Sequence, residues 1–459
     1  MGKEAKEKDP SKIGVGKFII WNATSASSAI NVVLLTLITV YCTNAVGLSA
    51  AGVGTCLMLS KIFDGVTDLV AGYIVDNTNT KIGRGRPYDL CIVGLWICTY
   101  LMFSVPAGMS TIVKYIWLFV TYALCQSVFR TFLNAASVPY MVRVFNEQQY
   151  VKLSSWGGLF TTACVLVFNV IFPTLYAPII SSASGWSRLV LCVTIPMIII
   201  GIMRFLFIPE KYVIKEANSE HITLRDLIAC LKASKNIYPV AAVQFVLGIS
   251  SNLAVSTYYF LYVVGNVSIT GVMSLLGIVS MLTMVFYPWL LKHITTKQLI
   301  QLGYLLMVIP GIVIFIAKDN LFLLAIAGVF TGASTLPGSY MSNLLNIDCA
   351  DYNEVRGLSR MEGTLTAITG LANKIGAAFG TFLTGILLTM SGFDGTLEVQ
   401  PDSAIMMIRC CYSIVPALFA VLAAATLMFY KLDKKKPEIQ AALAEKRAND
   451  AAAAAAAAE

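Results

Sequence analysis

Residues Lys61 to Pro87 read KIFDGVTDLVAGYIVDNTNTKIGRGRP, an apolar run that ends in a turn rich in basic residues and glycine. Two carboxylates, Asp64 and Asp68, lie one helical turn apart inside the apolar run. A carboxylate at the centre of a bilayer costs about 2.5–3.5 kcal/mol even on lenient insertion scales. If this run crosses a membrane, the two acids indicate a function rather than packing.

The composition indicates a membrane protein with many spans. The chain has 459 residues, of which 57% are hydrophobic and 13% charged, and its mean hydropathy is +0.74. Soluble proteins average about 25% charged residues. The net charge of +8 does not indicate a nucleic-acid partner, because the basic residues fall between apolar segments, where they act as topology signals.

Twelve runs of mainly apolar residues approach the length of about 20 that a transmembrane helix needs. They are residues 17–42, 47–75, 88–109, 112–140, 151–180, 186–208, 237–262, 268–291, 298–317, 320–346, 360–390 and 404–430. The sequence therefore predicts an all-α polytopic membrane protein with twelve transmembrane helices. No charged leader with a small-residue cleavage site precedes the first run, so we expect the first span to direct insertion itself.

The basic residues are sorted unevenly between these spans. Most of the 33 Lys and Arg lie in the two terminal segments and in the connections 76–87, 143–152, 209–235, 292–297 and 348–360. The opposite side holds only Lys114, Arg188, Lys318 and Arg409. The positive-inside rule then places both termini of this inner- or plasma-membrane protein in the cytoplasm.

The longest charged connection, residues 209–235, separates six spans from six. This layout is typical of a transporter built from two bundles. We therefore divide the chain into a cytoplasmic tail (1–16), a six-helix bundle (17–208), a cytoplasmic linker (209–235), a second six-helix bundle (236–431) and a cytoplasmic tail (432–459). The alanine run that ends the last tail is left out of functional reasoning.

Charged residues inside the spans are candidates for function. Lys61, Asp64 and Asp68 are spaced i, i+3 and i+7, so they share one helix face. One alternative is an ion pair between Lys61 and Asp64, which leaves Asp68 without that cation. The other is a site for a mobile Na⁺, Li⁺ or H⁺, because two carboxylates can hold a hard cation or share a proton. No other cofactor is expected.

A second polar stripe lies on the fourth span. Gln126, Arg130 and Asn134 follow one another at four-residue spacing. A guanidinium inside a span must face a carboxylate or an aqueous cavity, and its fork suits a bidentate anion. Arg130 therefore either neutralises Asp64 or Asp68, or binds an anionic substrate. The residues leave both alternatives open.

Two further spans carry many polar groups. The first holds Trp21, Asn22, Thr24, Ser25, Ser27, Ser28 and Asn31. Taken one at a time, each of these side chains is best explained by helix packing. Taken together, the seven side chains suggest the wall of a cavity. The seventh span repeats the four-residue spacing with Gln244, Gly248, Asn252 and Ser256.

The eleventh span contains GLANKIGAAFGTFLTG, residues 370–385. Gly376 and Gly380 form a small-xxx-small pair, which predicts close helix packing. Lys374 requires an anion nearby, and Asp64 and Asp68 are the carboxylates deep in the spans that have no assigned role. We therefore expect the two halves to meet at a charge cluster near the midplane of the membrane.

Two segments resemble a known transporter family. They are YCTNAVGLSAAGVGTCLMLSKIFDGVTDLVAGYIVDNTNTKIGRGRP at 41–87 and DCADYNEVRGLSRMEGTLTAITGLANKIG at 348–376. Both are similar to the glycoside–pentoside–hexuronide cation symporters of the major facilitator superfamily, the group of the melibiose and glucuronide permeases. The second segment resembles the D-Y-x-E loop of that family, followed by a helix with a basic residue. The resemblance implies the major facilitator fold.

The resemblance also implies roles for individual residues. It implies a cation site at Asp64 and Asp68 with Thr131, and a part for Lys374 in coupling or substrate binding. Melibiose-type members carry acids on the first and fourth spans, where Ser28 and Asn134 stand nearest here. The loss of two negative charges beside Arg130 would favour an anionic substrate. Ser154, Ser155 and Trp156 stand about where many members place an arginine.

We therefore expect a monomeric secondary transporter, not an enzyme, that couples a glycoside or hexuronide to Na⁺ or H⁺ by alternating access. Ion binding would neutralise the acids and free Lys374 or Arg130 for the substrate. The expected substrate-binding residues are Asn22, Ser25, Ser28, Gln126, Arg130, Asn134, Trp156, Asn252 and Lys374. The alternatives are a lysolipid, amphiphile or organic-anion carrier of the same fold, and a membrane receptor that does not transport.

Overall fold

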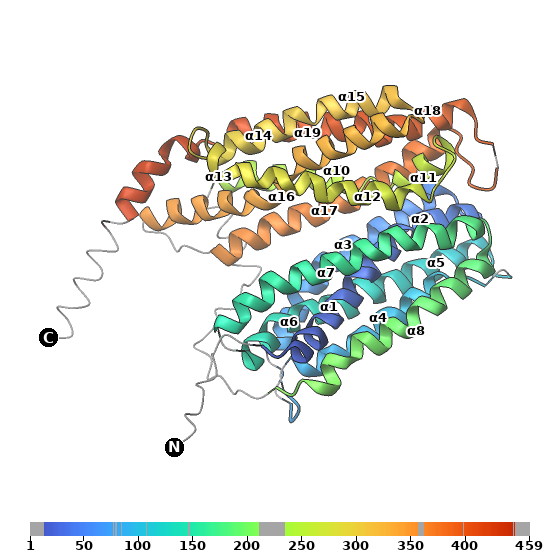
Figure 1. Ribbon diagram of the computed structural model, residues 1–459, viewed down its shortest axis with the longest axis horizontal. Coiled ribbons are helices and arrows are strands. Elements are labelled where there is room, and N and C mark those ends of the chain that lie inside the picture. The colour runs from blue at the N-terminus through green and yellow to red at the C-terminus, as the bar shows by residue number, and fades with distance from the viewer. Residues whose placement is uncertain are drawn as a thin grey trace, which may run out of the picture. The chain divides into compact units, whose positions relative to one another are not determined.

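The computed structural model describes residues 13–443 and 445, apart from 77, 79, 84, 107, 146, 211–234, 357–361 and 398. Within these residues every named element is a helix, as Figure 1 shows, and the β-structure is a single isolated bridge between Thr80 and Gly83. Most of the predicted linker 209–235, most of the N-terminal tail 1–16 and the alanine run lie outside the described residues.

The six predicted spans of the N-terminal half are all helical. Their elements are α1 (Val15–Thr36), α2 (Ile38–Val40) and η1 (Tyr41–Ala45); α3 (Ala50–Asp76); η2 (Arg86–Leu90) and α4 (Cys91–Met102); α5 (Thr111–Ala123), η3 (Leu124–Arg130) and α6 (Thr131–Val144); α7 (Glu147–Tyr176) and η4 (Ala177–Ile179); and α8 (Ala183–Phe207). Two of the short elements, η1 and η3, are π-helical.

The predicted spans of the C-terminal half are also helical. Their elements are α10 (Ile237–Ser251) and α11 (Ser256–Tyr262); α12 (Ile269–Met281), η5 (Leu282–Phe286) and α13 (Tyr287–Leu290); α14 (Thr296–Leu306) and α15 (Val308–Ala317); α16 (Leu321–Val355); α17 (Glu362–Met390); and α18 (Asp402–Tyr412), α19 (Ile414–Thr426) and η6 (Leu427–Phe429), after which η7 (Leu432–Lys435) follows.

Ten helices of the described residues are long and apolar enough to cross a membrane. The other two predicted spans correspond to α3 and α4. In α3 the charges of Lys61, Asp64 and Asp68 lower the hydropathy, and α4 has only 12 residues. The all-helical, multi-pass architecture is thus confirmed, while the count of twelve spans stays a prediction.

The chain forms two compact units. The first unit contains residues 1–219, 260–274 and 385–404, and the second contains 220–259, 275–384 and 405–459. In the first unit, Asn44 Nδ2 donates to Tyr262 Oη at 2.6 Å, and the Ala51 amide donates to Thr389 Oγ1 at 3.0 Å. These bonds attach segments from late in the chain to the ends of η1 and α3. The predicted division into bundles 17–208 and 236–431 stays a prediction.

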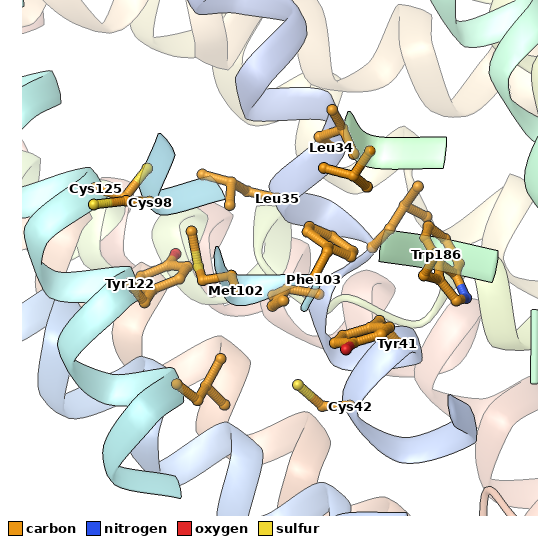
Figure 2. Packing of buried hydrophobic residues seen from close by; sticks show 14 of the residues in the cluster. Leu34, Leu35, Tyr41, Cys42, Cys98, Met102, Phe103, Tyr122, Cys125 and Trp186 are labelled. Atoms are coloured by element: carbon orange, nitrogen blue, oxygen red, sulfur yellow. The ribbon is translucent and has the colours of Figure 1, made fainter. Parts of the chain in front are cut away.

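An aromatic cluster forms the core of the first unit. The ring centroids of Tyr41 and Phe103 lie 5.1 Å apart, and those of Phe103 and Trp186 lie 5.5 Å apart. Figure 2 shows these side chains together with Leu34, Leu35 and Met102. Cys42 and Cys125 are buried in the same cluster. Burial of large aromatic side chains dominates core stability, so this cluster holds η1, α4 and α8 together.

Helix α16 is longer than predicted. It continues to Val355, although the predicted span ends at 346, because Leu345, Cys349 and Ala350 are fully buried in the core of the second unit. The D-Y-x-E residues, expected in a loop, therefore lie on the last turns of a helix. Residues 357–361 of the same motif segment lie outside the described residues.

The predicted packing role of the glycine pair on α17 is confirmed. A Cβ added at Gly376 would lie 2.0 Å from the carbonyl oxygen of Phe245, and one at Gly380 would lie 2.4 Å from that of Ile249. Both contacts are with the backbone of α10, so only glycine allows the two helices to approach so closely.

A buried ion pair anchors the end of α8. Arg204 Nε donates to Asp89 Oδ2 at 2.8 Å, a second bond joins Nη2 to Oδ1, and both side chains are 2% exposed. The guanidinium lies 4.8 Å from the ring centre of Trp21. Two buried charges are tolerated because each satisfies the other. The sequence reasoning missed this pair, although Asp89 and Arg204 fall inside the predicted spans.

The basic turn of the Lys61–Pro87 stretch is attached beside this pair. Glu210 Oε2 accepts hydrogen bonds from the backbone amides of Gly85 and Arg86, each at 3.2 Å. Arg86 Nε donates to the Phe205 carbonyl at 2.9 Å. Gly83 has a φ of 123°, which favours glycine. Arg84, the other arginine of the turn, lies outside the described residues.

Replacement of Asp89 by Asn should destabilise the protein strongly, because Arg204 would remain buried without a carboxylate. Breaking a buried ion pair on one side costs about 3–5 kcal/mol. Thermal melting of the purified protein in detergent measures the effect. The matched control is Asp319→Asn, which removes the same charge from an exposed turn and should leave the melting temperature unchanged. Equal melting of the two variants would contradict the anchoring role.

Candidate functional site

Three oxygen atoms surround the hydroxyl of Thr131. Thr131 Oγ1 lies 3.0 Å from Asp64 Oδ1, 3.0 Å from Asp68 Oδ1 and 3.2 Å from the Gln126 carbonyl oxygen. The two acids can both reach Thr131 because they stand one turn apart on α3, on the side that packs against α6. Asp64 is half-buried and Asp68 is exposed.

The hydroxyl cannot satisfy all three oxygens. It carries one proton, so it donates a hydrogen bond to one oxygen atom. Its lone pairs then face the lone pairs of the other two oxygen atoms, which is unfavourable. Those contacts become favourable when a carboxyl is protonated or a cation lies among the oxygens. Hard cations such as Ca²⁺ take oxygen ligands at about 2.3–2.6 Å, and oxygens about 3 Å apart are close enough to share such an ion. The donor set fits a small cation or a proton.

Arg130 donates hydrogen bonds to the first span. Its Nη2 donates to Asn31 Oδ1 at 2.6 Å, and its Nη1 donates to the carbonyl and hydroxyl oxygens of Ser28, each at 3.3 Å. Its Nε is buried and has no hydrogen-bond partner among the described residues. Its hydrogen bonds therefore go to neutral groups on α1, as expected for a guanidinium that can still take an anionic ligand.

The fourth span contains a π-helical segment, η3 (Leu124–Arg130). Hydrogen bonds of a π-helix run from i to i+5. The contact from Thr131 to the Gln126 carbonyl spans five residues. Asn134, expected on the same stripe, is exposed on α6. Segments of π-helix occur often at functional sites.

Several polar residues of the first span pack against other helices. Thr24 Oγ1 donates to the Gly201 carbonyl at 2.8 Å, and Ser27 Oγ donates to the Met197 carbonyl at 2.9 Å. Asn22 is 4% exposed and donates to the Phe18 carbonyl of its own helix at 2.9 Å. Thr24 and Ser27 therefore contribute to helix packing. Ser25 is half-buried, and the substrate roles of Asn22, Ser25 and Ser28 stay predictions.

The remaining predicted substrate residues are scattered. Trp156 on α7 is 64% exposed. Asn252 Nδ2 donates to the Gly248 carbonyl at 3.0 Å. The helix is interrupted at 252–255, so the stripe of the seventh span does not continue from α10 into α11. Lys374 belongs to the second unit, whereas Asp64 and Asp68 belong to the first. The predicted charge cluster between the halves stays a prediction.

Lys374 and Gln244 line a cavity of about 470 Å³ in the second unit. Its other polar lining includes Thr335 and Ser339 from α16 and Thr366 and Asn373 from α17. The sequence reasoning missed these four residues. The available signals were the four-residue spacing of Thr335 and Ser339, and the position of Asn373 next to Lys374.

The first unit contains a second cavity, of about 450 Å³, whose lining is almost entirely apolar. It lies among α1, α7 and α8 and is lined by residues such as Ile30, Phe160, Phe172 and Met197. Val167 and Ile171, which also line it, are more than half exposed. Cys164 is part of this lining.

Comparisons with known proteins show the family of this chain. The model of the family described as MFS/sugar transport protein matches residues 23–434. The chain is 28% identical over 425 residues to an isoprimeverose transporter of Lactiplantibacillus pentosus, covering 89% of this chain and 86% of the relative. It is 26% identical over 423 residues to a glucuronide carrier protein homolog of Escherichia coli, covering 87% and 88%.

A solved structure is also similar. The inward-facing crystal structure of a bacterial homologue of the human lysosomal transporter Spinster matches with a TM-score of 0.68 and 14% identity, and the match covers 94% of this chain and 98% of that one. At this identity the likeness concerns the fold alone.

Proposed function

The chain belongs to the MFS/sugar transport protein family, and on that premise we propose that it carries a glycoside or hexuronide across the membrane together with Na⁺, Li⁺ or H⁺. It is a multi-pass membrane transporter of sugar type and not an enzyme. The observation that supports coupling to a cation is the contact of the Thr131 hydroxyl with both Asp64 and Asp68.

The proposed ion binds among the oxygens of Asp64, Asp68 and Thr131. Two ionised carboxylates within an apolar helix repel each other and are costly to hold in a membrane. A bound Na⁺ or Li⁺, or a shared proton, lowers both costs. We therefore assign α3 and the start of α6 as the ion site, and the same account holds for any of the three ions.

Coupling follows from the position of Arg130. Arg130 ends η3 and Thr131 begins α6, so the residue that faces the ion site is bonded to the residue that faces Ser28 and Asn31. An ion that moves Thr131 also shifts Arg130. If Arg130 contacts the solute, ion binding and solute binding raise each other's affinity by the same factor.

The charge pattern favours an anionic solute. Arg130 holds a guanidinium near α1, while Ser28 and Asn134 stand where the resemblance places acids in melibiose-type members. A guanidinium fork suits the carboxylate of a uronide. One relative is named for isoprimeverose and another for a glucuronide, which are a neutral and an anionic sugar. We propose the uronide class for this chain, with Lys374 as a further contact.

An amphiphile carrier is the second candidate. The apolar cavity of the first unit, lined by residues such as Phe160 and Phe172, favours it, because an acyl chain binds in an apolar groove. The cavity of the second unit favours a sugar, because a ligand without hydroxyl groups would leave its polar lining without partners. The two functions are distinguished by measuring whether a lysolipid competes with the sugar for uptake.

We further propose that the protein works as a monomer in the inner or plasma membrane with both termini in the cytoplasm. The uneven distribution of Lys and Arg between the connections supports this orientation. Labelling of cysteines introduced into the two terminal segments, in intact cells and in inverted vesicles, tests it.

Replacement of Asp68 by Asn should abolish the dependence of uptake on the ion, because one charge and one ligand oxygen of the ion site are lost. Uptake of labelled glucuronide or isoprimeverose into proteoliposomes, with and without an imposed Na⁺ or proton gradient, measures the effect. Unchanged ion dependence in this variant, with normal insertion into the membrane, would rule out the site.

Thr131 provides the matched pair of controls. Thr131→Ser keeps the hydroxyl and should keep the ion affinity within about threefold, whereas Thr131→Val should weaken it about tenfold or more, as expected for a hydrogen bond to a charged group. The ion concentration that gives half-maximal uptake reports this affinity. Equal affinities for the Ser and Val variants would mean that Thr131 is not a ligand.

Replacement of Arg130 by Gln should weaken uronide transport selectively. Loss of a charge-assisted bond to the carboxylate predicts a fall of about tenfold or more in glucuronide uptake, and less than about threefold in isoprimeverose uptake. Arg188→Gln, which removes an exposed charge from α8, is the control and should change neither. Equal losses on both sugars would give Arg130 a structural role only.

A further inference from the structure

Lysines gather where two segments of the second unit meet. The turn between α13 and α14, residues 291–297, reads LKHITTK, and residues 430–436, at the end of the last predicted span, read YKLDKKK. Both segments belong to the second unit, and Figure 1 shows the red helical end of the chain beside α13 and α14. We call their six lysines the lysine cluster: Lys292, Lys297, Lys431, Lys434, Lys435 and Lys436.

Hydrogen bonds hold the two segments together. Thr295 Oγ1 donates to Asp433 Oδ2, and Lys297 Nζ donates to the Tyr430 carbonyl at 2.6 Å. The lysines of one segment are thus held beside those of the other, although more than 130 residues separate the partners of each bond.

The segment after the last span is also fixed to α16. Lys436 Nζ lies 2.8 Å from Asp348 Oδ1, and Leu432 and Ile439 are buried in the core of the second unit. These residues take the side of the segment that faces the protein. Lys431, Lys434 and Lys435 are exposed, and their i, i+3 and i+4 spacing places them on one side of the helical turn η7.

The positive charge of the lysine cluster is not balanced within the fold. Asp433 is the one carboxylate in residues 291–297 and 430–436, and Asp348 is occupied by Lys436. In the part of the chain that the structure describes, no carboxylate forms an ion pair with the four exposed lysines, Lys292, Lys431, Lys434 and Lys435.

The basic residues of the first unit differ in this respect. Arg86 Nε donates to the Phe205 carbonyl at 2.9 Å, and Arg143 Nη1 lies 3.5 Å from Glu210 Oε1. Those cations contribute to the fold. A role as topology signals explains why lysines follow the spans, but it does not explain why the fold gathers six of them on two segments that are fixed to each other.

Exposed apolar side chains precede the lysines on both segments. Phe286 and Trp289 are 63% and 60% exposed, and Met428 and Phe429 are 70% and 74% exposed. They end the predicted spans 268–291 and 404–430, so in a bilayer they face acyl chains near the membrane surface. The lysines that follow them then lie at the level of the lipid headgroups.

This combination complements an anionic phospholipid. Four or more lysines directly after a transmembrane helix attract anionic headgroups, and each ammonium group offers three N–H donors to phosphate oxygens. A zwitterionic lipid has no net negative charge to match the cluster. A soluble polyanion has no acyl chain to cover the exposed aromatic side chains.

We propose that the lysine cluster binds the headgroup of an anionic phospholipid whose acyl chains lie against Trp289 and Phe429. This lipid site goes beyond the proposed function. It depends on the insertion of the chain into a membrane, and it is independent of which ion or sugar is transported.

The test uses the purified full-length protein in a neutral detergent, titrated with dioctanoyl phosphatidylglycerol or dioctanoyl phosphatidylcholine, with bound lipid counted by native mass spectrometry. The wild type should prefer phosphatidylglycerol. The double variant Lys434→Gln/Lys435→Gln should bind it about tenfold more weakly or less tightly still, because two cations near the headgroup are lost. Lys434→Arg/Lys435→Arg keeps both charges and should keep the preference.

The matched control is Arg188→Gln/Lys318→Gln, which removes two exposed cations outside the lysine cluster and should leave lipid binding unchanged. Melting temperatures without added lipid confirm that all variants fold. Glycerol 1-phosphate, which has the phosphate but no acyl chain, should not displace the lipid at equal concentration. Displacement by it would assign the cluster to free phosphate and overturn the lipid site.

Two further results would overturn the proposal. One is equal binding of the two lipids by the wild type, and the other is an unchanged preference for phosphatidylglycerol in Lys434→Gln/Lys435→Gln. Either result would leave the lysines as topology signals only. Neither result bears on the ion dependence of uptake, so the proposed symport is tested separately.

Discussion

One hydroxyl proton serves two carboxylates in this protein. Thr131 Oγ1 lies 3.0 Å from an oxygen of Asp64 and 3.0 Å from an oxygen of Asp68, and it can donate to only one of them. A proton on one carboxyl, or a cation among these oxygens, makes both contacts favourable. A membrane makes this need stronger, because two carboxylates in an apolar helix are expensive. The proposals for ion binding, for the role of Arg130 and for coupling all depend on this constraint.

Much of the architecture could be predicted from the sequence. Hydropathy and the distribution of basic residues are local properties, and the spans predicted from them match helical segments to within a few residues at most ends. Asp64 and Asp68 of α3 could be recognised as candidates because charged residues are rare in apolar runs. The prediction failed where packing decides: α16 extends to Val355 because Leu345 and Cys349 are buried, and the break after α10 has no strong signal in composition.

The site was predictable only in part. Asp64, Asp68 and Thr131 meet as the family resemblance implies. The partners of Arg130 could not be predicted, because its hydrogen bonds to Ser28 and Asn31 join helices far apart in the sequence. The cavity of the second unit was missed because its lining comes from helices far apart in the sequence, such as α10 and α16.

The two units carry different chemistry. The first holds the paired acids and Arg130, and the second holds a cavity rich in hydroxyl groups with Lys374. Coupled transport requires that ion and solute affect each other's affinity equally. The most direct measurement is therefore the dissociation constant of the sugar as a function of ion concentration, and that of the ion as a function of sugar concentration. The account predicts the same factor of increase in both titrations, and sugar affinity independent of Na⁺, Li⁺ and pH would contradict it.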